Sequence, residues 1–130
     1  MSRRALLTLT VLPGRYAISR LDARVDVPFW AQEGQFVSVT RTSAELSIVC
    51  PEDKVPNGVS CVPGWRALKC EGPLDWALTG IVASLAEPLA GAGVAIFPIA
   101  THDTDYLLIR EPQLEQAIQA LTAYGHAIRD

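Results

Sequence analysis

Apolar residues in the first half of the chain recur with a period of two, which predicts strands. Over residues 6–12 leucine and valine alternate with threonine, and Pro13-Gly14 ends the segment. Residues 22–35 show no clean period and predict a loop or a short turn of helix. Proline and glycine are frequent over residues 51–64, the best candidate for a boundary between two halves. The predicted strands are residues 6–12, 16–21, 36–41 and 45–50, the last two forming a hairpin.

The second half of the chain is more regular and predicts helices between strands. Residues 81–90 place apolar side chains on one side of a helix, which Pro88 should kink or shorten. Residues 114–124 follow a spacing of three and four, and Gly125 ends that helix. The nearly unbroken apolar run over residues 94–100 predicts a central strand. The other predicted strands are residues 65–71, 106–109 and 126–129, the last at an edge.

The predicted order in the second half is strand, helix, strand, strand, helix, strand. This order is typical of the ferredoxin-like fold, in which two helices cover one face of an antiparallel sheet. The first half looks like a degenerate copy, because residues 36–52 align with residues 95–111 at a constant shift of 59. Trp30 and Trp76 align at a shift of 46, and the difference of 13 residues is one helix that the first half lacks.

We therefore expect an α+β protein with tandem ferredoxin-like domains, a degenerate one over residues 1–64 and a regular one over residues 65–130. Hydrophobic residues make up 49% and charged residues 19% of the chain, which excludes intrinsic disorder. The net charge of -3 argues against a nucleic-acid binder. No apolar run approaches the roughly 20 residues that a membrane helix needs.

The N-terminus and the cysteines indicate a cytoplasmic protein. Arg3-Arg4 and the apolar stretch after them imitate a signal peptide, but the stretch is short and alternates as a strand does. Cys50, Cys61 and Cys70 are odd in number and form no CxxC motif. Neither a disulfide framework nor a zinc site is indicated, so we expect reduced, buried thiols and no cofactor.

Five polar residues, 101–105, interrupt two apolar strands. One interpretation is a solvated hairpin turn, because aspartate and threonine favour turns. The other is a ligand site. Asp103 and Asp105 can hold an ammonium or guanidinium group by charge-assisted hydrogen bonds, and Thr101 and Thr104 can donate and accept.

Gly80 and Ile81 lie where the first strand of the regular half leads into its first helix. Glycine lets the backbone approach a ligand closely, and the first N–H groups of a helix favour an anion such as a carboxylate. A plain loop glycine is the alternative. In this fold the loop neighbours the second strand, residues 94–99, so one site could hold the carboxylate and the amine of an α-amino acid.

Catalysis is weakly supported. His102 is adjacent to Asp103, but neighbours on an extended segment point to opposite faces and would not chelate a metal together. Asp103 and Asp105 could form a carboxylate pair, yet no acid–base partner is identified. The chain has no GxSxG motif and no phosphate loop. We therefore expect a protein that is not an enzyme.

The segment from Gly80 to Ile109 resembles an ACT domain. The resemblance rests on Val94-Ala95-Ile96-Phe97 and on the pattern Thr-x-x-Thr-Asp-Tyr that begins at Thr101. It is similar to the ACT domains of aspartate kinases and of the CASTOR arginine sensors. The chain most resembles the small bacterial stand-alone ACT-pair proteins, whose first half is similar to residues 36–50.

The resemblance implies a regulatory protein that binds a small ligand between two ACT domains, whose second strands pair edge to edge. Because only one half is regular here, a homodimer would build the pocket. By position, Ala95 and Ile96 would offer backbone groups. His102 stands where the arginine sensors carry an aromatic residue. The predicted ligand set is Gly80, Ile81, Ala95, Ile96, Thr101, His102, Asp103, Thr104 and Asp105.

The leading hypothesis is thus a non-catalytic regulatory protein that binds an amino acid or a similar small ligand as a homodimer. No nucleic acid and no membrane are expected as partners. The alternative is a protein–protein interaction module without a ligand, which docks on an enzyme or regulator through its apolar strand edge.

Overall fold

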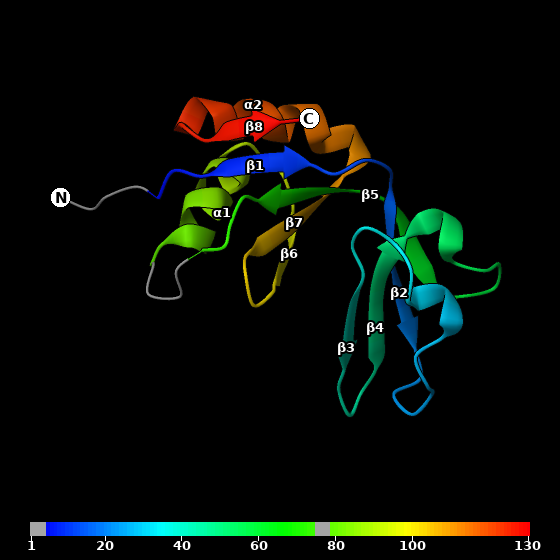
Figure 1. Cartoon of the computed structure of the whole chain (residues 1–130). Coiled ribbons are helices and arrows are strands. Elements are labelled where there is room, and N and C mark those ends of the chain that lie inside the picture. Colours follow the sequence, from blue (N-terminus) through cyan, green and yellow to red (C-terminus); the bar gives the residue numbers. More distant parts are fainter. Residues whose placement is uncertain (1–4, 75–78) are drawn as a thin grey trace. The chain divides into compact units, whose positions relative to one another are not determined.

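The structure, a computed structural model, describes residues 5–74 and 79–130 and contains two compact units (Figure 1). The larger unit comprises residues 1–13 and 66–130, and the smaller unit comprises residues 14–65 between them. The predicted domains, 1–64 and 65–130, stay a prediction. The structure adds that the first strand, β1 (Thr8–Val11), pairs within the larger unit.

The larger unit has the order of strands and helices that the sequence predicts. After β1 its elements are the end of β5 (Cys61–Cys70), α1 (Ile81–Gly91), β6 (Phe97–Ala100), β7 (Asp105–Arg110), the short turn η3 (Glu111–Gln113), α2 (Leu114–Tyr124) and β8 (Ala127–Arg129). From β5 onward this is the βαββαβ order, so the ferredoxin-like fold class is confirmed. No helix in residues 5–74 and 79–130 is long and apolar enough to cross a membrane.

β1 adds a strand to the ferredoxin-like sheet. The strand order in the larger unit is β6-β7-β5-β1-β8. β1 runs antiparallel to β5, with Leu9 opposite Cys70, and parallel to β8, with Leu9 opposite Ile128. Figure 1 shows β1, in blue, beside β8, in red. The predicted edge position of the last strand is confirmed.

The apolar run over residues 94–100 is not a central strand. β6 covers only its last four residues and pairs with β7 alone among the described strands, so it is an edge. The apolar character has another cause: Val94 is buried in the core and Ile96 packs against it before the strand begins. An apolar run indicates that its residues are buried, not that the strand has two neighbours. Here Val94 is buried and Ile96 packs against the core, while β6 pairs on one side only among the described strands.

The core of the larger unit lies between its sheet and both helices. Alternate residues of three strands point to the same face, and the apolar sides of α1 and α2 cover them. The buried residues on the strands are Leu9, Val11, Leu68, Cys70, Leu107 and Ile109, and those on the helices are Ile81, Leu85, Leu89, Ala117 and Leu121. Both helices therefore lie on one face of the sheet, as predicted.

α1 continues through Pro88 to Gly91, so the proline does not shorten the helix. Pro88 has no N–H, and the carbonyl of Ser84 lacks its usual intrahelical donor. His126 replaces that donor. Its Nδ1 accepts the N–H of Leu7 at 3.0 Å, so Nε2 carries the proton and donates to the Ser84 carbonyl at 2.8 Å. The ring is buried and stacks on Tyr124.

The smaller unit is a four-stranded antiparallel sheet in the order β3-β4-β2-β5. Its elements are β2 (Tyr16–Leu21), the turn η1 (Phe29–Ala31), β3 (Ser38–Arg41), β4 (Leu46–Pro51), the turn η2 (Glu52–Lys54) and the start of β5. Its core contains Ala31, Leu46, Ile48 and Cys50. Residues 14–65 include no α-helix, which confirms that the first half lacks a full helix.

The two units share one repeated hairpin. A shift of 59 residues carries β3 onto β6, β4 onto β7 and η2 onto η3. The same shift relates the strand pairing of the two hairpins, because Ser38 lies opposite Val49 and Phe97 lies opposite Leu108. The alignment found in the sequence is therefore an alignment of strands in register. Trp76, which the sequence aligned with Trp30, lies outside the described residues.

Candidate functional site

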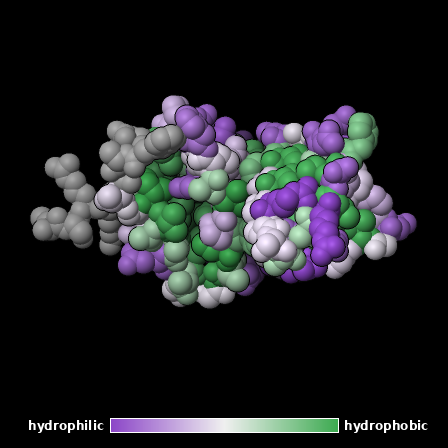
Figure 2. Space-filling view, turned by 90° about the horizontal axis from the view of Figure 1, so that it is seen from below, coloured by the Kyte–Doolittle hydropathy of each residue, from purple (hydrophilic) through white to green (hydrophobic). Residues whose placement is uncertain are grey.

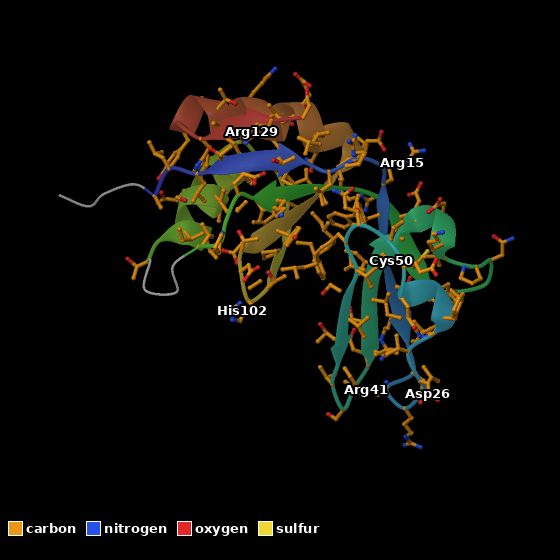
Figure 3. All side chains as sticks on the ribbon, in the orientation of Figure 1. Arg15, Asp26, Arg41, Cys50, His102 and Arg129 are labelled. Atoms are coloured by element: carbon orange, nitrogen blue, oxygen red, sulfur yellow. The ribbon has the colours of Figure 1, made fainter. Side chains whose placement is uncertain are left out.

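The polar residues between β6 and β7 form a tight hairpin turn, Thr101–Thr104, which we call the polar turn. The N–H of Thr101 donates to the carbonyl of Thr104 at 2.8 Å, and the Thr101 hydroxyl donates to the same oxygen at 3.0 Å. Figure 3 shows His102 at the tip of this hairpin, with its ring pointing away from the sheet. The polar turn is therefore a fixed structure whose tip lies in solvent.

His102 and Asp103 contact each other, which corrects the sequence interpretation. Nδ1 of His102 and Oδ1 of Asp103 lie 2.8 Å apart. The prediction that these neighbours point to opposite faces is wrong, because it assumed an extended segment and the chain turns here. Both side chains are largely exposed, so water screens their attraction and the pair adds little stability.

Thr104 is buried, and its hydroxyl already donates a hydrogen bond within the protein. Oγ1 of Thr104 donates to the carbonyl of Cys70 at 2.8 Å. Next to it, the N–H of Leu74 donates to the carbonyl of Asp103 at 2.7 Å. Thr104 is thus placed to hold the polar turn rather than to touch a ligand. The sequence gives no sign of a role for the segment Cys70–Leu74, called the strap below, because it follows the predicted strand 65–71 and carries no recognisable motif.

Asp105 is the predicted residue whose side chain is best placed for a charged ligand. It begins β7 and has the same parity as Leu107 and Ile109, so its carboxylate points to the face that the helices cover. It lies near Cys70, whose thiol has its pKa raised to about 12, first by burial and then by the charges of Asp105 and Glu71. Within residues 5–74 and 79–130 no cation pairs with this half-buried carboxylate.

The start of α1 offers backbone groups only. Gly80 is the N-cap, with a φ of 75° that favours glycine, and an added Cβ there would meet nothing within 4 Å. Among residues 5–74 and 79–130, no side chain caps the first turn of α1. Ile81 is buried in the core, so its N–H, not its side chain, is what a ligand could reach. An anion is the group that such a helix start favours.

The open edge of β6 is the remaining predicted element. Ala95 is exposed, whereas the side chain of Ile96 packs onto the core. Because Thr101 bonds to Thr104, the residue before β7, the alternation of an antiparallel ladder turns the backbone groups of Pro98 and Ala100 outward. Pro98 has no N–H, so this edge is richer in acceptors than in donors.

The three cysteines carry free thiols that differ in how deeply they are buried. Burial raises the pKa of the Cys50 thiol to about 11, with smaller contributions from Cys61 and Asp53. Cys61 is only partly buried. In the described part of the chain, no three His, Cys, Asp or Glu side chains are placed to hold a metal ion.

A thiol reagent at pH 8 is expected to modify Cys61 well before Cys50 and Cys70. The two buried thiols form little thiolate at that pH, and the thiolate is the reactive species. Mass spectrometry of peptides from briefly labelled native protein would give the three rates. Labelling of Cys70 as fast as that of Cys61 would contradict the burial described here.

Comparisons with known proteins bear on both units. A family model of an N-terminal domain matches residues 14–58, and an ACT-domain model matches residues 60–123. No curated protein matches the chain. A crystal structure of a protein from Agobacterium tumefaciens is similar at 44% identity, with a TM-score of 0.91, over 95% of this chain and 92% of that one.

More distant structures share the fold. A Vibrio cholerae protein of unknown function is similar at 18% identity with a TM-score of 0.73, over 91% of this chain and 89% of that one. The regulatory subunit of aspartate kinase from Thermus thermophilus, in its ligand-free form, is similar at 11% identity with a TM-score of 0.64. This match covers 93% of the present chain and 99% of the subunit.

Proposed function

Because this chain belongs to the ACT-domain family, we propose that it is a non-catalytic regulatory protein that binds an amino acid or a similar zwitterion between two copies of itself. The observation that carries the proposal is the carboxylate of Asp105. It is half-buried on the helix-facing side of β7, and no cation within the described residues neutralises it. A ligand ammonium group would supply the missing charge.

The two ends of the ligand would use different chemistry. The ammonium group binds Asp105 by charge-assisted hydrogen bonds. The carboxylate binds the N–H groups at Gly80 and Ile81, where no side chain of the described residues caps α1. Backbone groups at Ala95 and Ile96 and the side chains of Thr101, His102 and Asp103 complete the proposed pocket.

A second copy is proposed to close this pocket, because the larger unit presents apolar surface that is unusual for an exposed helix and edge strand. Val82 on α1 is 51% exposed, and the outward side of α1 carries Ala83, Ala90 and a single charge, Glu87. Figure 2, which views the molecule from below, shows hydrophobic residues over much of the visible face of the larger unit, with hydrophilic residues around them. Such a surface marks an interaction site in a cytoplasmic protein of this kind.

The charge of the site predicts which amino acids bind. The proposed residues include Asp103 and Asp105 and no lysine or arginine. We expect L-lysine to raise Tm and L-glutamate to leave it unchanged, because a second carboxylate on the ligand would face two aspartates. A ligand at 100 times its Kd stabilises the folded state by about 2.7 kcal/mol, which a thermal-shift screen of the twenty amino acids would detect.

The control for this screen is Asp105→Asn, which keeps the shape and removes the charge. Loss of one charged hydrogen bond should weaken L-lysine binding by about ten- to a hundredfold. No shift with any amino acid, or equal shifts in wild type and variant, would refute the proposal. A stoichiometric protein partner recovered without any ligand response would favour the alternative, an interaction module that docks through the apolar edge of β6.

A further inference from the structure

We propose that Thr104 and Gly72 are positioning residues, which clasp the polar turn to the strap and so set the direction in which Asp105 presents its carboxylate. The effect of the clasp on ligand binding rests on the proposed function, whereas the clasp itself does not. Neither residue touches the ligand: they act through the backbone next to Asp105.

Two hydrogen bonds make the clasp. The Thr104 hydroxyl donates to the Cys70 carbonyl at 2.8 Å, and the Leu74 N–H donates to the Asp103 carbonyl at 2.7 Å. The Thr104 bond is buried, where a lost partner costs more than it does in water. Asp105 follows Thr104 directly, so a fixed Thr104 fixes the backbone from which the carboxylate projects.

Gly72 lets the two segments approach this closely. A Cβ on Gly72 would lie 3.1 Å from the carbonyl oxygen of Asp103 and 3.2 Å from Cβ of Thr104. It would also lie 3.0 Å from the N atom of Leu74. The φ of Gly72 is not in the left-handed region, so the close approach and not the backbone conformation requires glycine here. A side chain at this position would require the strap or the polar turn to shift by a few tenths of an ångström, which strains the clasp.

The repeated hairpin in the smaller unit provides an internal comparison. Ala44 lies 59 residues before Asp103, and its carbonyl is also anchored, by the guanidinium of Arg20 at 2.9 Å. That anchor is exposed. Glu45 stands at the position of Thr104, and Leu46 at that of Asp105. The buried clasp therefore occurs in the repeat that carries the carboxylate and is replaced by a surface contact in the repeat that lacks it.

Hydrogen exchange at the Leu74 amide tests the clasp without any ligand. Thr104→Val removes the hydroxyl at nearly constant shape and is expected to speed exchange at Leu74 about tenfold, whereas Thr104→Ser keeps the hydroxyl and should exchange like wild type. Gly72→Ala should also speed hydrogen exchange at the Leu74 amide about tenfold. Gly91→Ala is the matched control, because an added Cβ there meets nothing within 4 Å. Unchanged exchange in both Thr104→Val and Gly72→Ala would overturn the clasp.

Titration calorimetry with L-lysine tests the positioning role. We expect about tenfold weaker binding in Thr104→Val and Gly72→Ala, and wild-type binding in Thr104→Ser, Gly91→Ala and Arg20→Ala. Faster exchange with unchanged L-lysine affinity would overturn the positioning role and leave a purely structural contact. Failure of the wild type to bind L-lysine would count against the proposed ligand, whereas faster Leu74 exchange in the variants would still support the clasp.

Discussion

Replacing His126 by leucine is expected to lower the free energy of unfolding by about 3 kcal/mol, because it leaves one buried and one partly buried backbone group without partners. The Leu7 N–H loses its acceptor and the Ser84 carbonyl loses its donor. Leucine fills a similar volume, so lost hydrogen bonding rather than a cavity would dominate. Urea denaturation followed by circular dichroism would measure the change.

Pro88→Ala provides the control for this prediction. An alanine at position 88 restores an N–H that can donate to the Ser84 carbonyl within the helix. The cost of His126→Leu should then fall by about 1 kcal/mol when both changes are present. Additive effects of the two changes would show that His126 does not replace the donor that Pro88 lacks.

Raising the pH above about 9 is expected to destabilise the fold strongly through Cys50 and Cys70. Burial raises the pKa of these thiols from 9.0 to about 11 and to about 12, so the unfolded chain releases its thiol protons at a lower pH than the folded chain. Stability is therefore complete below pH 9 and falls as the pH rises toward the folded-state values. The slope is about 1.4 kcal/mol per pH unit for each thiol, and the total loss is on the order of a few kcal/mol.

Alanine variants isolate this effect from other alkaline titrations. Cys50→Ala and Cys70→Ala lower stability at neutral pH by leaving small cavities, but each should flatten the fall between pH 9 and 11. Cys61→Ala, at a partly buried position, is the matched control and should keep the wild-type slope. Denaturation curves recorded at half-unit pH steps would show the slopes. Equal slopes in all four proteins would contradict a role for the buried thiols.

The sequence predicts the repeated hairpin well because its signal is local. A two-residue period marks each strand, and Thr42 and Thr101 open both turns with the same backbone bond. The shift of 59 residues between the halves then carries information about three-dimensional pairing, since one register occurs twice. The fold class follows from the order of these elements.

The features that the sequence does not predict depend on contacts between distant segments. Nothing in the alternation of β1 shows that it pairs with β5 and β8, because an amphipathic strand fits any sheet with a free edge. Thr104 was expected among ligand residues because a threonine in a polar run gives no sign of burial. Its partner, the Cys70 carbonyl, lies 34 residues away in the chain.

The position of β1 has a consequence for how the protein matures on the ribosome. Among the described strands β8 has one neighbour, β1, so the strand made last completes its hydrogen bonds on a strand made first. Residues 14–65 contain the partners of β2, β3 and β4, the most distant pair being Tyr16 and Trp65, so this unit can fold during synthesis before β8 is made. Assembly of the larger unit therefore cannot be completed until β8 has been synthesised and pairs with β1.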